Sequence, residues 1–120
     1  MAVGLAACQS GGSSAGPSAS GGGGGSASDC TIAVSWNNFQ QPRWAAADQP
    51  NIKKVVEDAG AKYIDADANL SNEQQATDID TMISKGAKVL IVLAQDTKAV
   101  LPSIAKAKAA GVPVIAYDRL

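Results

Sequence analysis

Short apolar runs alternate with helical patterns along most of the chain, and this alternation constrains the fold more than any other feature. Four runs rich in β-branched and aliphatic residues predict strands at 31–35, 62–66, 89–93 and 112–117. The third run, Val89-Leu90-Ile91-Val92-Leu93, is apolar throughout, which is typical of a strand covered on both faces. The sequence therefore predicts an α/β fold, a parallel sheet with right-handed crossovers and helices on both faces.

Three amphipathic segments separate these strands. The first helix carries its stripe at Ile52, Val55, Val56 and Ala59, the second at Ala76, Ile79, Met82 and Ile83, and the third at Val100, Ile104 and Ala107. We expect Pro50 in the first turn of the first helix, or a kink there if that helix begins near Trp44. Ser71 and Gln74 predict a capping box, and Thr97 is the expected N-cap of the third helix.

The N-terminal quarter of the chain has a different composition. Residues 9–29 are mostly glycine, serine and alanine, so we expect a flexible tether. Before it, Leu5-Ala6-Ala7-Cys8 resembles a bacterial lipobox, and we interpret residues 1–8 as the remnant of a lipoprotein signal peptide with Cys8 as the lipidation site. The alternative is a chance run of small residues. The predicted folded part is residues 30–120.

Composition excludes several classes of function. The formal net charge of −1 gives no electrostatic argument for nucleic acid. Histidine is absent, and the two cysteines, Cys8 and Cys30, form neither a CxxC pair nor a disulfide framework. No phosphate-binding glycine loop follows the first strand, and no nucleophile has a base partner. We therefore expect no metal, no cofactor and no enzymatic activity.

Ligands of open parallel sheets bind beyond the carboxyl ends of the strands, where this sequence places polar residues. The candidates there are Asn37, Asn38, Arg43, Asp67, Asn69, Gln95, Asp96, Asp118 and Arg119. The pair Asp118-Arg119 follows its strand without a turn residue, which holds both charges at the rim of the sheet. A carboxylate beside a guanidinium suits vicinal hydroxyls, which donate to one and accept from the other. The alternatives for this pair are a surface ion pair or a helix cap.

Several motifs closely resemble the xylose-binding subgroup of periplasmic sugar-binding proteins, the ribose-binding-protein-like components of ABC transporters. They are Pro42-Arg43-Trp44, Asp48, the segments 59–63, 66–69 and 87–91, and Gly111 to Arg119. The resemblance implies that residues 30–120 are the N-terminal lobe of a two-lobed protein whose second lobe is missing here. We expect this lobe alone to bind sugar very weakly, because half a cleft does not exclude water.

The resemblance also assigns residues. It implies that Arg43, Asp118 and Arg119 bind a monosaccharide, with xylose the leading candidate, and that ABC permease subunits are partners. Trp44 is expected at the base of the cleft, as core packing or as a ligand contact, and Asn37, Asn38 and Gln95 are candidate cleft-lining residues. The implied location is extracytoplasmic, in the periplasm or at the cell surface, anchored to the membrane through Cys8.

Two other functions use the same fold. A sugar-sensing domain of a transcription regulator would carry an N-terminal helix-turn-helix, where this chain has its glycine-rich segment. A sugar receptor for chemotaxis or signalling would carry the same residues as a transport component, so the sequence leaves that alternative open.

Overall fold

The computed structural model describes residues 27–119, which form a four-stranded parallel sheet. The strands are β1 (Thr31–Trp36), β2 (Lys62–Asp67), β3 (Val89–Val92) and β4 (Val114–Ala116), in the order β2-β1-β3-β4. The predicted α/β fold with a parallel sheet is confirmed. β4 is shorter than the predicted 112–117 and begins directly after Pro113, a residue without the N–H that a strand ladder uses.

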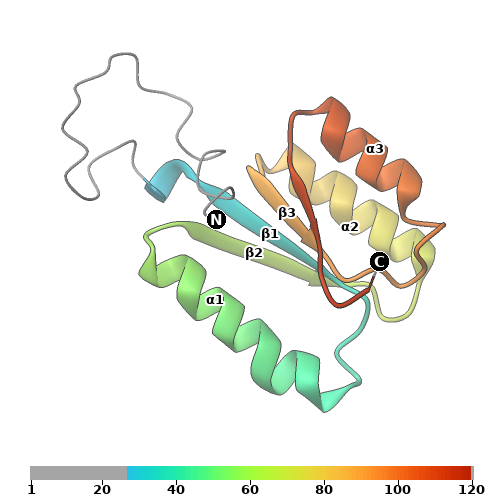
Figure 1. Cartoon of the computed structure of the whole chain (residues 1–120), viewed down its shortest axis with the longest axis horizontal. Coiled ribbons are helices and arrows are strands. Elements are labelled where there is room, and N and C mark those ends of the chain that lie inside the picture. The colour runs from blue at the N-terminus through green and yellow to red at the C-terminus, as the bar shows by residue number, and fades with distance from the viewer. Residues whose placement is uncertain (1–26, 120) are drawn as a thin grey trace.

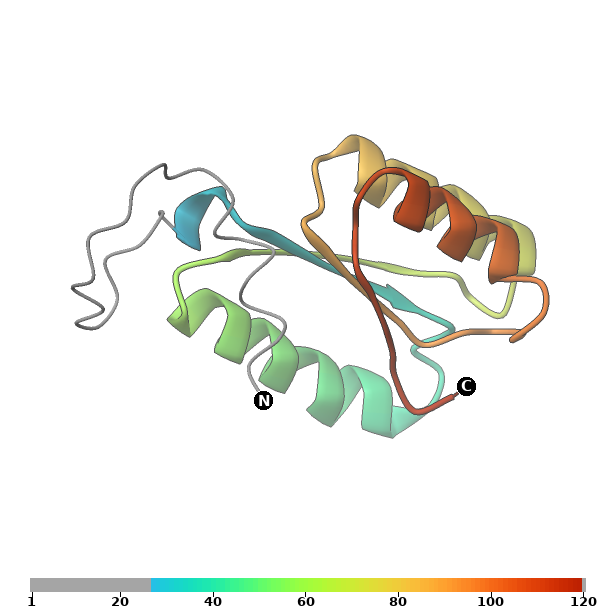
Figure 2. The same ribbon diagram turned by 45° about the horizontal axis from the view of Figure 1, so that its top comes forward.

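Helices cover both faces of this sheet, as the alternation predicted. α1 (Gln49–Asp58) lies on one face, and α2 (Asn72–Ser84) and α3 (Leu101–Ala109) lie together on the other (Figures 1 and 2). A short 3-10 turn, η2 (Ala27–Asp29), precedes β1 at the end of the predicted tether, whereas the rest of that tether and the lipobox lie outside the described residues. Within residues 27–119, no helix has the length and apolar character needed to cross a membrane.

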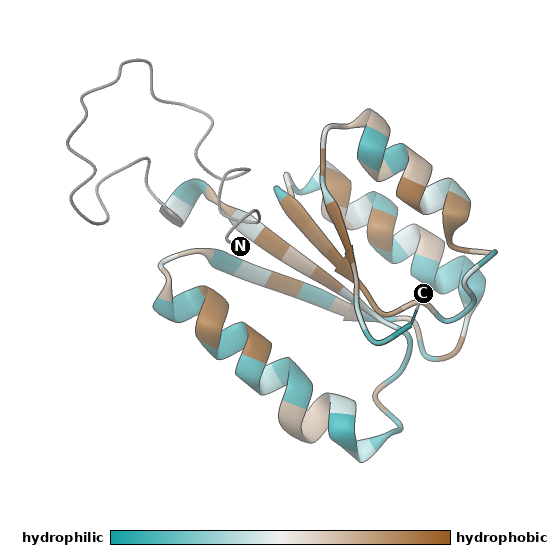
Figure 3. Cartoon of the chain, in the orientation of Figure 1, coloured by the Kyte–Doolittle hydropathy of each residue, from teal (hydrophilic) through white to brown (hydrophobic). Residues whose placement is uncertain are grey.

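The larger core lies between the sheet and the α2–α3 layer. The predicted inward stripes of both helices contribute to it: Ile79, Met82 and Ala107 are buried, and Ile83 and Ile104 pack against them. β1 and β3 supply Ala33, Leu90 and Val92 from the central strands. Figure 3 shows β3 and β4 as largely hydrophobic strands, whereas β2 mixes hydrophilic and hydrophobic residues.

The α1 layer is much thinner, which differs from the sequence pattern. None of the residues of α1 is buried, and Val55, one of the four expected stripe residues, is 69% exposed. Ile52 packs against the small cluster on this face, but one helix covers only the β1–β2 side of the sheet. Ile115 of β4 is consequently 45% exposed.

Pro50 occupies the first turn of α1 as predicted, but α1 continues directly from a π-helix, η3 (Trp44–Asp48). The main-chain N–H of Gln49 donates to the carbonyl of Trp44, five residues earlier, instead of the usual four. Proline has no N–H and its ring crowds the carbonyl four residues before it, so α-helical bonding cannot pass through Pro50 undisturbed. The π turn takes the place of the kink that the sequence predicted.

The two predicted helix caps have different outcomes. Ser71 caps α2, accepting the N–H of Gln74 at 3.1 Å, but the N–H of Ser71 donates to the Ala68 carbonyl and not to the Gln74 side chain, so only half of the capping box forms. Thr97 does not cap the third helix. The N-cap of α3 is Val100, which makes no side-chain cap bond, and the turn before it is held by Asp96, whose carboxylate accepts the main-chain N–H groups of Lys98 and Ala99, each at 2.8 Å. Hydrogen bonds from Ala99 and Lys98 also lower the pKa of Asp96.

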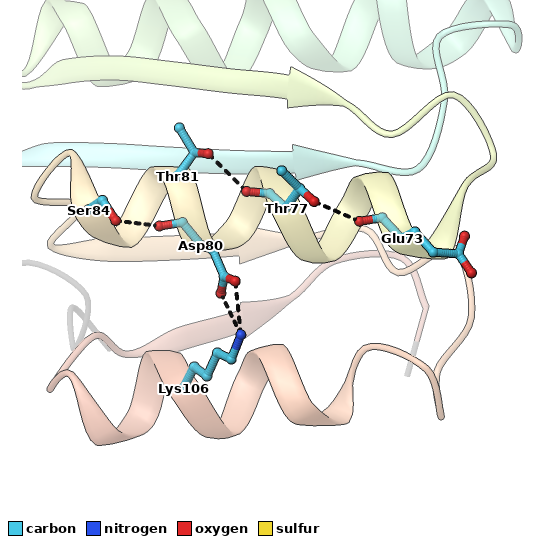
Figure 4. Close-up of polar contacts among 6 residues, drawn as sticks. All are labelled: Glu73, Thr77, Asp80, Thr81, Ser84 and Lys106. Carbon is cyan, nitrogen blue, oxygen red and sulfur yellow. Dashed lines mark hydrogen bonds and ion pairs between the residues drawn. The ribbon is translucent and has the colours of Figure 1, made fainter.

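The exposed side of α2 carries hydroxyl groups that bond to its own backbone. Thr77, Thr81 and Ser84 each donate to the carbonyl four residues earlier (Figure 4). Asp80 on the same helix accepts Nζ of Lys106 of α3 at 2.8 Å, which joins the two helices across their outer surface.

We expect Lys106→Ala to change the free energy of unfolding by less than about 1 kcal/mol, because both side chains are more than 45% exposed and water screens the pair. Urea unfolding of the variant checks this value. A loss above about 2 kcal/mol would mean that the Asp80–Lys106 bridge, and not the buried stripes of α2 and α3, holds the helical layer together.

Candidate functional site

Four aromatic side chains form a cluster at the carboxyl end of the sheet, on the α1 side. Trp36 ends β1, and its ring centroid lies 5.6 Å from Phe39, 6.5 Å from Trp44 and 6.2 Å from Tyr117. Trp36 is fully buried, Trp44 is 3% exposed, and both belong to the smaller core of this face. The cluster therefore forms a rigid floor beneath the ends of β1 and β4.

Arg43 lies on this floor and joins two distant parts of the chain. Its guanidinium carbon is 4.4 Å from the centroid of the Trp44 ring, a cation–π contact. Nη1 lies 3.3 Å from Oδ1 of Asp118, which is 75 residues later in the sequence. The Arg43 side chain is 58% exposed, so it combines fixed geometry with access to solvent. The structure thus brings together two of the three residues expected to bind sugar.

A second carboxylate, Asp48, completes the arrangement. Its Oδ2 accepts Nε of Arg43 at 3.1 Å and the hydroxyl of Tyr117 at 2.8 Å. Desolvation alone would lower the pKa of the Arg43 guanidinium, but the carboxylates of Asp48 and Asp118 and the Tyr117 hydroxyl together raise it. Arg43 is therefore a permanent cation held between two carboxylates.

Asp118 and Arg119 follow β4 at the same rim. Asp118 has a φ of 63°, in the left-handed region that aspartate tolerates better than most residues, and it turns the chain sharply so that the N–H of Arg119 donates to the carbonyl of Tyr117 at 2.7 Å. Arg119 is exposed and borders an apolar hollow of about 180 Å³ between α3 and β4. Arg119 thus lies at the rim with Asp118 but makes no ion pair with it in the described residues.

Asn37 and Asn38 are buried in the loop after β1, at 1% and 3% exposure. The Asn38 carboxamide oxygen accepts the N–H groups of Gln40 and Gln41, and the Asn37 carbonyl accepts the N–H of Leu70. In this structure both residues shape the loop that leads to Arg43. The side chains of Asn37, Asn38 and Trp44 are all buried. Contact of these three residues with a ligand stays a prediction.

Gln95 is half-buried after β3, and it reveals a residue that the sequence reasoning missed. Its N–H donates to the side-chain oxygen of Gln75, whose amide nitrogen donates to Ser35 Oγ and to the Leu93 carbonyl, both at 3.0 Å. Gln75 is 2% exposed and so ties α2 to the ends of β1 and β3. It lies four residues before Ile79, and a polar residue on that apolar stripe was the signal for it.

The two tyrosines of the chain are hydrogen-bonded to carboxylates, Tyr63 to Asp65 within β2 and Tyr117 to Asp48 at the rim. Burial and the bond to Asp65 raise the pKa of Tyr63, and desolvation and the bond to Asp48 raise that of Tyr117. A tyrosine whose pKa is higher in the folded than in the unfolded state contributes to the free energy of unfolding. This contribution is fully present below the pKa of the unfolded state, about 10, and is lost as the pH rises through the pKa of the folded state.

We therefore expect the absorbance of tyrosinate near 295 nm to appear above pH 10 in the native protein and near pH 10 in the unfolded protein. The free energy of unfolding should fall as the pH rises above about 10. A Tyr117→Phe, Tyr63→Phe double variant should remove most of that slope. Coincident native and unfolded titration curves would contradict the two tyrosine–carboxylate bonds.

The chemistry offered by this rim is that of polar recognition. Two guanidinium groups and two carboxylates lie around the ends of β1 and β4, and they can donate to and accept from hydroxyl groups. In residues 27–119, no three metal-ligating side chains gather at one point.

Comparison with known proteins agrees with this fold. The chain is 30% identical over 94 residues to the D-xylose-binding periplasmic protein of Escherichia coli, a match that covers 78% of this chain and 28% of that protein. An ABC transporter solute binding protein from Mycobacterium smegmatis, solved with bound glycerol, superposes with a TM-score of 0.73 at 33% identity, over 76% of this chain and 31% of that one.

A carbohydrate transporter solute binding protein from Chloroflexus aurantiacus, solved in complex with D-glucose, gives a TM-score of 0.66 at 30% identity. The match covers 77% of this chain and 26% of that one. The chain therefore spans less than a third of the length of these three relatives. Residues 32–120 match the family described as the periplasmic binding protein domain. The chain belongs to this family, whose members are binding proteins and not enzymes.

Proposed function

We propose that this chain is the N-terminal lobe of an extracytoplasmic protein that captures a monosaccharide and delivers it to an ABC importer. The observation that carries the proposal is the pairing of Arg43 with Asp118 at 3.3 Å, on an aromatic floor and at the carboxyl end of the sheet. Arg119 is the third proposed sugar-binding residue. The relatives named above bind xylose and glucose by their descriptions, which supports a sugar as the ligand class.

The rim has the groups that a pyranose requires. Asp118 offers carboxylate oxygens to sugar hydroxyl donors, and Arg43 keeps guanidinium N–H groups beyond the two that bond Asp48 and Asp118. Charge-assisted bonds of this kind are roughly twice as strong as neutral ones. A second lobe would close over these groups, exclude water and strengthen each contact.

Isothermal titration of the full-length protein with D-xylose, D-glucose and D-ribose tests this proposal, with L-leucine and L-glutamate as non-sugar controls. We expect micromolar or tighter binding of at least one sugar, and xylose is the proposed preference. Binding of an amino acid with no sugar bound would overturn the proposal. Tighter binding of glucose than of xylose would overturn only the choice of sugar.

We also propose that Cys8, outside the described residues, carries the lipid that anchors the protein to the membrane. The lipobox-like Leu5-Ala6-Ala7-Cys8 and the glycine-rich segment after it support this. Cells fed a radioactive fatty acid should label the wild-type protein and not a Cys8→Ala variant. Equal labelling of both would contradict the anchor.

A further inference from the structure

We infer that Asp48 is a positioning residue for sugar binding: it holds the Arg43 guanidinium at the rim through a contact that exists only because the helix between them is a π-helix. This inference rests on the proposed function of the site. Asp48 is not expected to touch the sugar itself. It acts through Arg43.

The geometry of the helix brings Arg43 and Asp48 together. In an α-helix, residues five apart are about 140° apart around the axis and do not face each other. Arg43 and Asp48 are five apart, and the segment between them is the π-helix η3, whose turn closes five residues back. The two side chains therefore stack on one side of the helix, with Nε and Oδ2 separated by 3.1 Å.

Asp48 is also linked to the chain at the end of β4. The Tyr117 hydroxyl donates to the same Oδ2 of Asp48 at 2.8 Å, and Tyr117 directly precedes Asp118. Asp48 thus receives a hydrogen bond from each of the two segments that carry the proposed sugar-binding pair. Its side chain is 14% exposed, against 58% for Arg43, so the carboxylate is the fixed member and the guanidinium the accessible one.

These contacts of Arg43 have a consequence for binding. Arginine has several rotatable bonds, and ordering them only when the sugar binds would weaken affinity. Asp48 holds Nε, Trp44 supports the guanidinium face at 4.4 Å, and Asp118 takes Nη1 at 3.3 Å. Arg43 is therefore ordered before the ligand arrives, and losing Asp48 should weaken binding without removing any group that touches the sugar.

A double-mutant cycle in the full-length protein tests this inference with D-xylose titrations. We expect Asp48→Asn to weaken sugar affinity about tenfold, which lies within the range of coupling energies measured for pairs of residues in contact. In an Arg43→Ala background the same change should weaken affinity by less than about twofold. Equal losses in the two backgrounds would overturn the inference, because a merely structural role for Asp48 does not depend on Arg43. Asp58→Asn is the matched control: Asp58 ends α1, the helix that continues η3, is 63% exposed and forms an ion pair with Lys54, so affinity should not change.

Tyr117→Phe provides a second route if Asp48→Asn does not fold. It leaves every charge in place and removes one anchor of Asp48, so we expect a smaller loss of affinity that also vanishes in the Arg43→Ala background. A loss that persists there would overturn the inference.

A measurement without sugar separates this inference from the proposed function. The sequence contains two arginines, Arg43 and Arg119. In a ¹⁵N NMR spectrum, the Nε–H signal of Arg43 should be protected from exchange with solvent in the wild type. In the Asp48→Asn variant it should be exposed to that exchange. Unchanged protection would overturn the positioning contact even if sugar binds. A protected signal in a protein that binds no sugar would leave the contact in place and overturn the role in binding together with the proposed function.

Discussion

Replacing Arg119 by alanine in the full-length protein is expected to weaken monosaccharide binding by about 1.5–3 kcal/mol, roughly ten- to a hundredfold, the usual range for a hydrogen bond to a charged group. Arg119 is exposed at the end of β4 and makes no ion pair in the described residues, so its removal leaves no buried carboxylate unpaired. The loss should therefore appear in affinity and not in stability. Isothermal titration and urea unfolding of the same variant measure the two separately.

Lys88→Ala is the matched control for Arg119→Ala. Lys88 is also exposed, but it lies just before β3, at the amino end of the sheet and away from the rim. Its replacement should leave affinity unchanged. Wild-type affinity for Arg119→Ala would show that Arg119 does not bind the sugar and that Arg43 and Asp118 carry the polar contacts of this lobe.

The second large effect is expected at Gln75, in the core of the fold. Gln75→Leu replaces the amide with an apolar side chain of similar size on α2 and removes three hydrogen bonds at once, to Ser35, Leu93 and Gln95. Each group left buried without a partner costs about 1–3 kcal/mol. We expect the free energy of unfolding to fall by about 3 kcal/mol or more.

Urea unfolding checks the Gln75 prediction, with Thr77→Ala as the control. Thr77 is exposed two residues further along α2, and surface changes of this kind usually stay within about 0.5 kcal/mol. A loss below about 1 kcal/mol for Gln75→Leu would mean that water or other donors replace the Gln75 amide. The ends of β1 and β3 would then be held by the sheet alone.

Local pattern predicted most of the fold. The β-branched runs gave the four strands, because a strand buried in a parallel sheet needs apolar residues on both faces, as Leu90 and Ile91 illustrate. The helical stripes of α2 and α3 were equally readable, since Ile79, Met82 and Ala107 are buried. α1 was the exception: Val55 fits the periodicity but faces solvent, because burial depends on what packs against the helix.

The candidate site was only partly readable. Parallel strands bring their carboxyl ends to one edge, so the closeness of Arg43 and Asp118 followed from topology. The π-helix did not, because the residues of η3 are compatible with an α-helix and only the bonding pattern around Pro50 distinguishes the two. Asp48 was therefore missed as a partner of Arg43. The sequence likewise did not show that Asp96, and not Thr97, would bond the main chain of the turn before α3, because both side chains are suited to such bonds.

The central claim is that the rim formed by Arg43, Asp118 and Arg119 contacts a monosaccharide. A crystal structure of the full-length protein grown with the tightest-binding sugar tests it most directly. We predict sugar hydroxyl oxygens within hydrogen-bond distance of the Arg43 guanidinium, the Asp118 carboxylate and the Arg119 guanidinium, with Asp48 still bonded to Arg43 Nε. A sugar bound elsewhere, with Arg43 and Asp118 paired only to each other, would contradict the claim.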